Sequence, residues 1–170
     1  MNNLGIKFKI MTIAIVGLLG LGIMSAYMLN SIAKTRAKAE YSEQIVDTIT
    51  NQNSFIHELQ KERGFSSGVL AGGDNAKLLA QRKNVDAALE KLAEKSEIAP
   101  ELAKVRSEVD QKGGDNPIGR ITNILRKEVI AINGYSDKLE PSLVDDLKRI
   151  IIVGEIKESF GILRATLNGV

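Results

Sequence analysis

The chain has 170 residues, about the length of one domain, because domains usually run to ~100–200 residues. It has no cysteine, one histidine and no tryptophan, which excludes disulfide frameworks and thiolate metal sites and leaves little for a histidine metal site or a base-stacking platform. Of its 23 lysines and arginines, Lys7 and Lys9 precede a long uncharged run, so the rest of the chain balances 21 basic against 21 acidic side chains. That balance argues against a nucleic-acid partner.

Residues 10–33 form a run of 24 residues without a charged side chain. A helix of ~20 apolar residues spans the hydrocarbon core of a bilayer, whereas the apolar part of a cleaved signal peptide is only ~7–15 residues long. Met24 also makes a poor cleavage site of Met24-Ser25-Ala26. We therefore expect an uncleaved transmembrane signal anchor at 10–33.

The flanking charges do not fix the orientation of this anchor, since Lys34, Arg36 and Lys38 on one side oppose the two lysines on the other. The simpler topology has a cytoplasmic stub at 1–9 and a sensor domain at 34–170 on the periplasmic or extracellular side. We expect a bacterial inner (cell) membrane location on this topology.

Residues 34–170 read as antiparallel helices, because no segment alternates with the period of a strand. The first helix is expected to continue from the membrane to about Leu70, with Gly72-Gly73 ending it and Asp74 or Asn75 capping the next. Its stripe has the alternating four- and three-residue spacing of a packed seam. The stripe consists of Ile45, Ile49, Gln52, Ile56, Leu59, Arg63, Ser66 and Leu70.

A second helix should end before Pro100, followed by a shorter one and a loop at 111–116. Asn116-Pro117 is typical of a helix start, and Asn133-Gly134 of a helix end. A last helix is expected from about Pro141. The apolar sets are Leu78, Val85, Leu89 and Leu92 in the second helix, Leu102, Val105 and Val109 in the shorter one, and Leu143, Leu147, Ile150, Val153, Ile156, Phe160, Leu163, Leu167 and Val170 in the last.

The sequence thus predicts an all-α fold, with the transmembrane helix continuing into an antiparallel, four-helix-type bundle. The last helix is still apolar at Val170, so we expect the domain to be part of a longer receptor. The long seams favour a homodimer.

Arg63 occupies a seam position where the pattern requires an apolar residue. A guanidinium there must reach solvent, pair with a carboxylate or meet an anion, because burying it unpaired costs several kcal/mol. Gly64 and Ser67, with Gly68 and Ala71, form a small-residue face beside it. Such a face admits either a close helix or a ligand.

Arg63-Gly64-x-x-x-Gly68-Val69 is echoed by Arg164-Ala165-x-x-x-Gly169-Val170. Two guanidinium groups facing one pocket would favour a bound anion between them. Arg63, Arg164, Gly64 and Ser67 are therefore our candidate anion-binding residues, with Arg82 and Arg106 as weaker ones. No catalytic constellation, metal-ligand spacing or phosphate-binding glycine loop is present, so we expect neither an enzyme nor a cofactor.

The segment HELQKERGFSSGVLAGG from His57 resembles the first motif of the nitrate- and nitrite-sensing (NIT) domain family. QRKNVDAAL from Gln81 and KESFGILRA from Lys157 are similar to later segments of that family, and the opening LGIKFKI resembles the start of methyl-accepting chemotaxis receptors. The resemblance implies a helical periplasmic sensor that binds nitrate or nitrite through arginines, here Arg63 and Arg164. The chain departs from the family at Leu163, where Glu is common.

We therefore expect a membrane-anchored sensory input domain for nitrate or nitrite that passes a conformational signal through its membrane helix. One alternative is a helical receptor domain for another small ligand. A second is a single-span helical scaffold that binds a protein partner and keeps its arginines in structural ion pairs. The output, whether chemotaxis, a kinase or transcription, is left open by the sequence.

Overall fold

The computed structural model describes residues 5–135, 138–139 and 141–167, without the side chains of 141, 142, 158, 162 and 164–167. The described residues form five helices and no strands, which confirms the all-α prediction. The helices are α1 (Ile6–Leu70), α2 (Ala76–Leu89), α3 (Lys95–Asp110), α4 (Pro117–Asn133) and α5 (Pro141–Leu167). The chain divides into two compact units between Glu43 and Gln44, so α1 contributes to both.

The first unit is the N-terminal part of α1. Its large apolar side chains between Ile6 and Ile32 are 48–78% exposed. An exposed apolar surface of this size is unfavourable in water but not in hydrocarbon. By length and composition, α1 is the one described helix that could cross a membrane.

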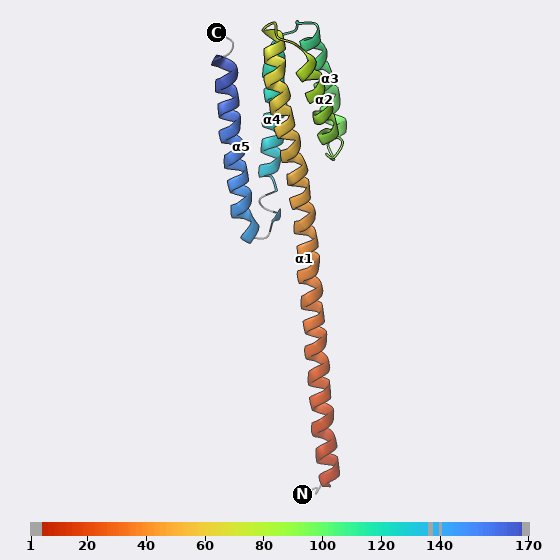
Figure 1. Cartoon of the computed structure of the whole chain (residues 1–170). Coiled ribbons are helices and arrows are strands. Elements are labelled where there is room, and N and C mark those ends of the chain that lie inside the picture. Colours follow the sequence, from red (N-terminus) through yellow and green to blue (C-terminus); the bar gives the residue numbers. More distant parts are fainter. Residues whose placement is uncertain (1–4, 136–137, 140, 168–170) are drawn as a thin grey trace. The chain divides into compact units, whose positions relative to one another are not determined.

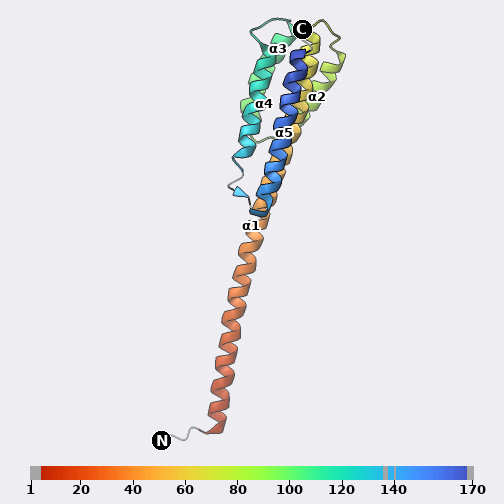
Figure 2. The ribbon, with the colours of Figure 1, turned by 90° about the vertical axis from the view of Figure 1, so that its left-hand side faces the viewer.

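In the second unit, successive helices run in alternating directions, so that α3 and α5 run with the end of α1 while α2 and α4 run against it (Figures 1 and 2). The seam predicted on α1 is confirmed from Ile45 through Ser66, all of which is buried, and Leu70 is half-buried. This seam packs against apolar side chains of every other helix. They include Val85, Leu89, Ile98, Leu102, Val105, Ile121, Leu125, Ile132 and Leu147.

The helix ends follow the predicted turn residues. Gly72 has φ +96°, and the Gly73 N–H donates to the Gly68 carbonyl at 2.9 Å, so α1 ends with a left-handed glycine that closes its last turn. Asp74 Oδ1 accepts from Ala76 N at 3.2 Å at the start of α2. The Asn116 side chain caps α4 by accepting from Gly119 N at 2.9 Å.

The second helix ends before Pro100, as predicted, but the expectation that it includes Leu92 is wrong. α2 already ends at Leu89, and Pro100 lies inside α3, where it is exposed. Leu92 lies in the turn between them and is buried, so the three-residue spacing from Leu89 to Leu92 continues across the break. The apolar pattern therefore gives no indication of the turn between α2 and α3.

The apolar stripe predicted on α5 is also wrong as a buried face over most of its described length. Leu147 is buried and Leu143 half-buried, but Ile150, Val153, Ile156, Phe160 and Leu163 are 42–67% exposed. The inward face instead contains Leu147, Ile151, Gly154 and Gly161, which are buried or half-buried. The two glycines have no side chain, so a pattern based on large apolar residues selects the opposite face. Leu167 and Val170 lie outside the described side chains.

Candidate functional site

Arg63 is 3% exposed and lies on the buried seam of α1. Its Nη1 donates to Thr122 Oγ1 on α4 at 3.2 Å. The Thr122 hydroxyl donates its own proton to the Ile118 carbonyl at 3.0 Å, which leaves an oxygen lone pair directed at the guanidinium. Arg63 is therefore held in place from α4.

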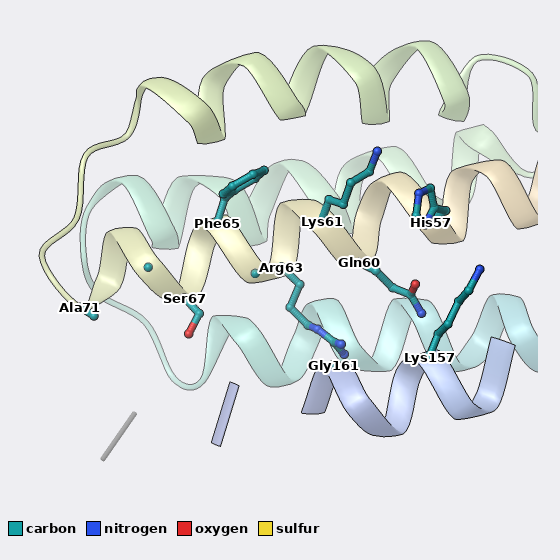
Figure 3. Close-up of a pocket in the computed structure, with 11 residues that line it drawn as sticks. His57, Gln60, Lys61, Arg63, Phe65, Ser67, Ala71, Lys157 and Gly161 are labelled. Atoms are coloured by element: carbon teal, nitrogen blue, oxygen red, sulfur yellow. The ribbon is translucent and has the colours of Figure 1, made fainter. Parts of the chain in front are cut away.

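On the α5 side, the guanidinium lies against the backbone of Gly161. A Cβ atom at position 161 would stand 2.5 Å from Arg63 Nη2. Figure 3 shows the side chain reaching from α1 toward Gly161. Arg63 therefore occupies space that exists because residue 161 has no side chain.

A cavity of about 520 Å³ opens beside this guanidinium. It lies within the size range of small-molecule sites. The described residues that line it include the cations Lys61, Arg63 and Lys157 and the imidazole of His57, but no aspartate or glutamate. The other lining residues are Gln60, Gly64, Phe65, Ser67, Gly68, Ala71 and Gly161.

One carboxylate lies next to this lining. Glu58 Oε1 accepts from Lys61 Nζ at 2.6 Å, and Glu58 Oε2 accepts from Gln81 Nε2 at 2.7 Å. Burial raises the pKa of Glu58, but the hydrogen bonds from Lys61 and Gln81 outweigh it and lower the pKa below the usual value. Glu58 therefore offsets the charge of Lys61 within the described lining.

The small-residue face predicted on α1 lines the cavity. A Cβ atom built at Gly64 or Gly68 would meet no described atom within 4 Å. The backbone of α1 is therefore accessible from the cavity next to Arg63. Of the candidate residues, the structure brings Arg63, Gly64 and Ser67 together here.

Arg164 lies in α5, three residues after Gly161, and its side chain is outside the described part. Its role remains a prediction.

Arg82 and Arg106 are not among the cavity residues but surround Glu62, whose side chain is fully buried. Arg106 donates from Nε and Nη2 to the two oxygens of Glu62 at 2.8 and 2.7 Å, and Arg82 Nε lies 3.5 Å from Glu62 Oε1. Asp86 and Asp110 accept from the same two arginines at 2.6 and 2.9 Å. Burial lowers the pKa of Arg106, but the bonds to Glu62 and Asp86 outweigh it and raise the pKa, so this guanidinium stays charged. The cluster joins α1, α2 and α3 by ion pairs.

The family model described as nitrate and nitrite sensing matches residues 54–170, which include every described residue of the cavity. The chain belongs to the nitrate- and nitrite-sensing family. This NIT family is sensory rather than catalytic, and in the described residues no group of three or more histidines, aspartates or glutamates could hold a metal. No curated protein and no solved structure is significantly similar to the chain.

Several residues of this geometry were not among the predicted site residues, including His57, Gln60, Lys61 and Phe65 of the cavity lining and the three residues Thr122, Gly161 and Lys157. Thr122 stands on the apolar face of α4 between Ile118 and Leu125, and a polar residue at such a position could have marked it. Gly161 and Lys157 both lie in the KESFGILRA segment of the NIT resemblance, but nothing local showed that they meet α1.

Proposed function

We propose that the second unit is a sensory input domain that binds nitrate or nitrite in the cavity beside Arg63. The observation that carries this proposal is a buried guanidinium, held from α4, at a cavity whose described lining contains cations and no carboxylate. Nitrate is a flat monoanion with several acceptor oxygens, and a planar guanidinium can donate to two of them at once. The match to the nitrate- and nitrite-sensing family favours this anion over other small ligands.

The remaining candidate residues take specific roles in this proposal. The Ser67 hydroxyl would supply a further donor, and Gly64 would let the anion approach the helix backbone. Arg164 would add a second guanidinium, an expectation that rests on its place in α5 and on the resemblance. Arg82 and Arg106 form no part of the proposed site, because their nitrogens already face carboxylates.

The anchoring proposal keeps residues 10–33 as one transmembrane helix in a bacterial inner membrane, 1–9 as a cytoplasmic stub and 34–170 as the periplasmic or extracellular part. The exposed apolar side chains of the first unit support it. The opening LGIKFKI supports a chemotaxis-type receptor as the output. α1 contains both the proposed transmembrane segment and Arg63. An anion that binds one packing of the bundle more tightly than another would increase the population of that packing. The membrane helix, as part of α1, would transmit this change.

A homodimer is part of the same proposal. The exposed residues Val153, Ile156, Phe160 and Leu163 on α5 are spaced by three, four and three residues. This is the spacing with which two equivalent helices pack side by side. Phe160→Glu should turn a dimer into a monomer in analytical ultracentrifugation of the full chain in detergent, whereas a wild-type monomer would contradict this part.

Thermal unfolding of the full chain in detergent, with nitrate, nitrite, chloride or sulfate, tests the binding proposal. A ligand at ~100 times its dissociation constant adds ~2.7 kcal/mol to the free energy of unfolding. We expect stabilisation by nitrate or nitrite that Arg63→Met abolishes. The matched control is Arg126→Met, which removes an exposed arginine from α4 and should leave the shift unchanged. A folded wild type that neither anion stabilises would contradict the proposal and leave the other-ligand and protein-scaffold alternatives.

A further inference from the structure

The guanidinium of Arg63 is positioned by two helices that are distant from it in sequence. Thr122 on α4 contacts Nη1 at 3.2 Å, and Gly161 on α5 leaves the space that Nη2 occupies. Figure 3 shows the Arg63 side chain crossing from α1 to this part of α5. An anion that binds Arg63 therefore binds a group whose place depends on both helices.

We propose that Thr122 and Gly161 are positioning residues of the anion site, which set where the Arg63 guanidinium stands without contacting the anion themselves. This inference rests on the proposed function. It assigns to each residue a separate requirement, an acceptor oxygen at 122 and the absence of a side chain at 161.

The requirement at 122 follows from the direction of its hydrogen bonds. Since the Thr122 hydroxyl proton is given to the Ile118 carbonyl, its oxygen can only accept from Arg63. Valine has the same shape without this acceptor, so Thr122→Val removes the hydrogen bond and keeps the packing. Thr122→Ser retains the oxygen and loses only a methyl group.

The requirement at 161 is steric. A Cβ at 161 would stand 2.5 Å from Arg63 Nη2 but 3.8 Å from Arg63 Cζ, so it would clash only with the end of the Arg63 side chain. This side chain is flexible and can rotate away. Gly161→Ala should therefore fold and displace the guanidinium. Gly154 lies two turns earlier on α5, and a Cβ there meets no described atom within 4 Å. Gly154→Ala thus makes the same change in helix propensity without touching Arg63.

The test measures nitrate affinity by isothermal titration calorimetry and the melting temperature without anion, for the full chain in detergent. Without the hydrogen bond to Thr122, the guanidinium should spend only a minor part of its time in the position in which it meets the anion. Because apparent affinity falls with the population of the binding-competent arrangement, nitrate binding in Thr122→Val should weaken by about tenfold or more. We expect a loss at least as large in Gly161→Ala. Thr122→Ser and Gly154→Ala should bind as the wild type does.

The outcomes separate the two proposals. If the wild type binds neither nitrate nor nitrite, the proposed function fails and the positioning roles with it. If the wild type binds but Thr122→Val and Gly161→Ala bind equally well, the positioning roles alone are wrong. Variants that melt lower than the wild type yet keep its affinity would show a structural role only, which also overturns the inference.

Discussion

Replacing Arg106 by methionine should destabilise the bundle without weakening the anion site. Glu62 is fully buried, and each of its oxygens accepts a hydrogen bond from Arg106, at 2.8 and 2.7 Å. Methionine keeps an unbranched apolar stem without the guanidinium, and among the described residues it leaves this carboxylate with Arg82 alone, whose Nε is 3.5 Å away. Arg63 contacts α4 and α5 rather than the α2 and α3 residues that surround Glu62, so its contacts should persist in this variant.

The magnitude follows from the burial of Glu62. Removing one partner of a buried ion pair costs ~3–5 kcal/mol, and the remaining arginine keeps the expected loss near the lower end, about 3 kcal/mol. A change of 1 kcal/mol shifts the melting temperature of a chain of 150–250 residues by ~2–4 °C, so we expect a decrease of about 6–12 °C. Replacing Glu62 by leucine in the same chain should recover part of this loss, because the unpaired charge is then gone.

The assay is thermal unfolding followed by far-ultraviolet circular dichroism, with and without nitrate. Lys104→Met is the matched control, since it removes an exposed charge from the same helix. A melting temperature of Arg106→Met close to that of Lys104→Met would refute the reasoning about the buried pair. Loss of nitrate stabilisation without a lower melting temperature would instead place Arg106 in the anion site.

Two further predictions concern the bundle. Burial, reinforced by the charge of Glu94, raises the pKa of Glu128 above its ordinary value of 4.5. The folded state then holds this proton more tightly than the unfolded chain, so stability should fall as the pH rises from 4.5 through the raised pKa. Glu128→Gln should remove this loss of stability with rising pH and stabilise the protein at neutral pH by about 1 kcal/mol. The reason is that the new amide can also donate to Gln52 Oε1, which has no described partner. A variant that melts below the wild type at neutral pH would contradict this prediction. Gly72→Ala should lower the free energy of unfolding by about 1 kcal/mol, since φ at this position is +96°. Gly154→Ala, the control inside a helix, should raise the melting temperature. Equal effects of the two substitutions would show that the left-handed turn is not required.

The elements with strong local patterns could be predicted from the sequence. The seam of α1, including the polar positions Gln52, Arg63 and Ser66, is buried as its spacing predicted. The ends at Gly72 and Asn116 followed from residue types that turns and caps require. These features depend on neighbours in the chain, so local reasoning reaches them.

Features that depend on which helix meets which could not be predicted. Glu62 lies next to the seam, and nothing in its spacing showed that two arginines from α2 and α3 would bury it. The packed face of α5 contains Gly154 and Gly161, whose lack of side chains gives no apolar pattern. The contact between Arg63 and Thr122 joins residues 59 positions apart, and only the three-dimensional arrangement reveals it.

The most direct test of the account is nitrate and nitrite affinity of the full chain when Arg63 is replaced by lysine. Lysine retains the positive charge but not the planar pair of donors that a flat anion can use. We expect calorimetry to show nitrate or nitrite binding to the wild type, binding weakened by about tenfold or more in Arg63→Lys, and no change in the control Arg126→Lys. Equal affinity of Arg63→Lys and the wild type, or a folded wild type that binds neither anion, would contradict the claim that the Arg63 guanidinium forms the anion site.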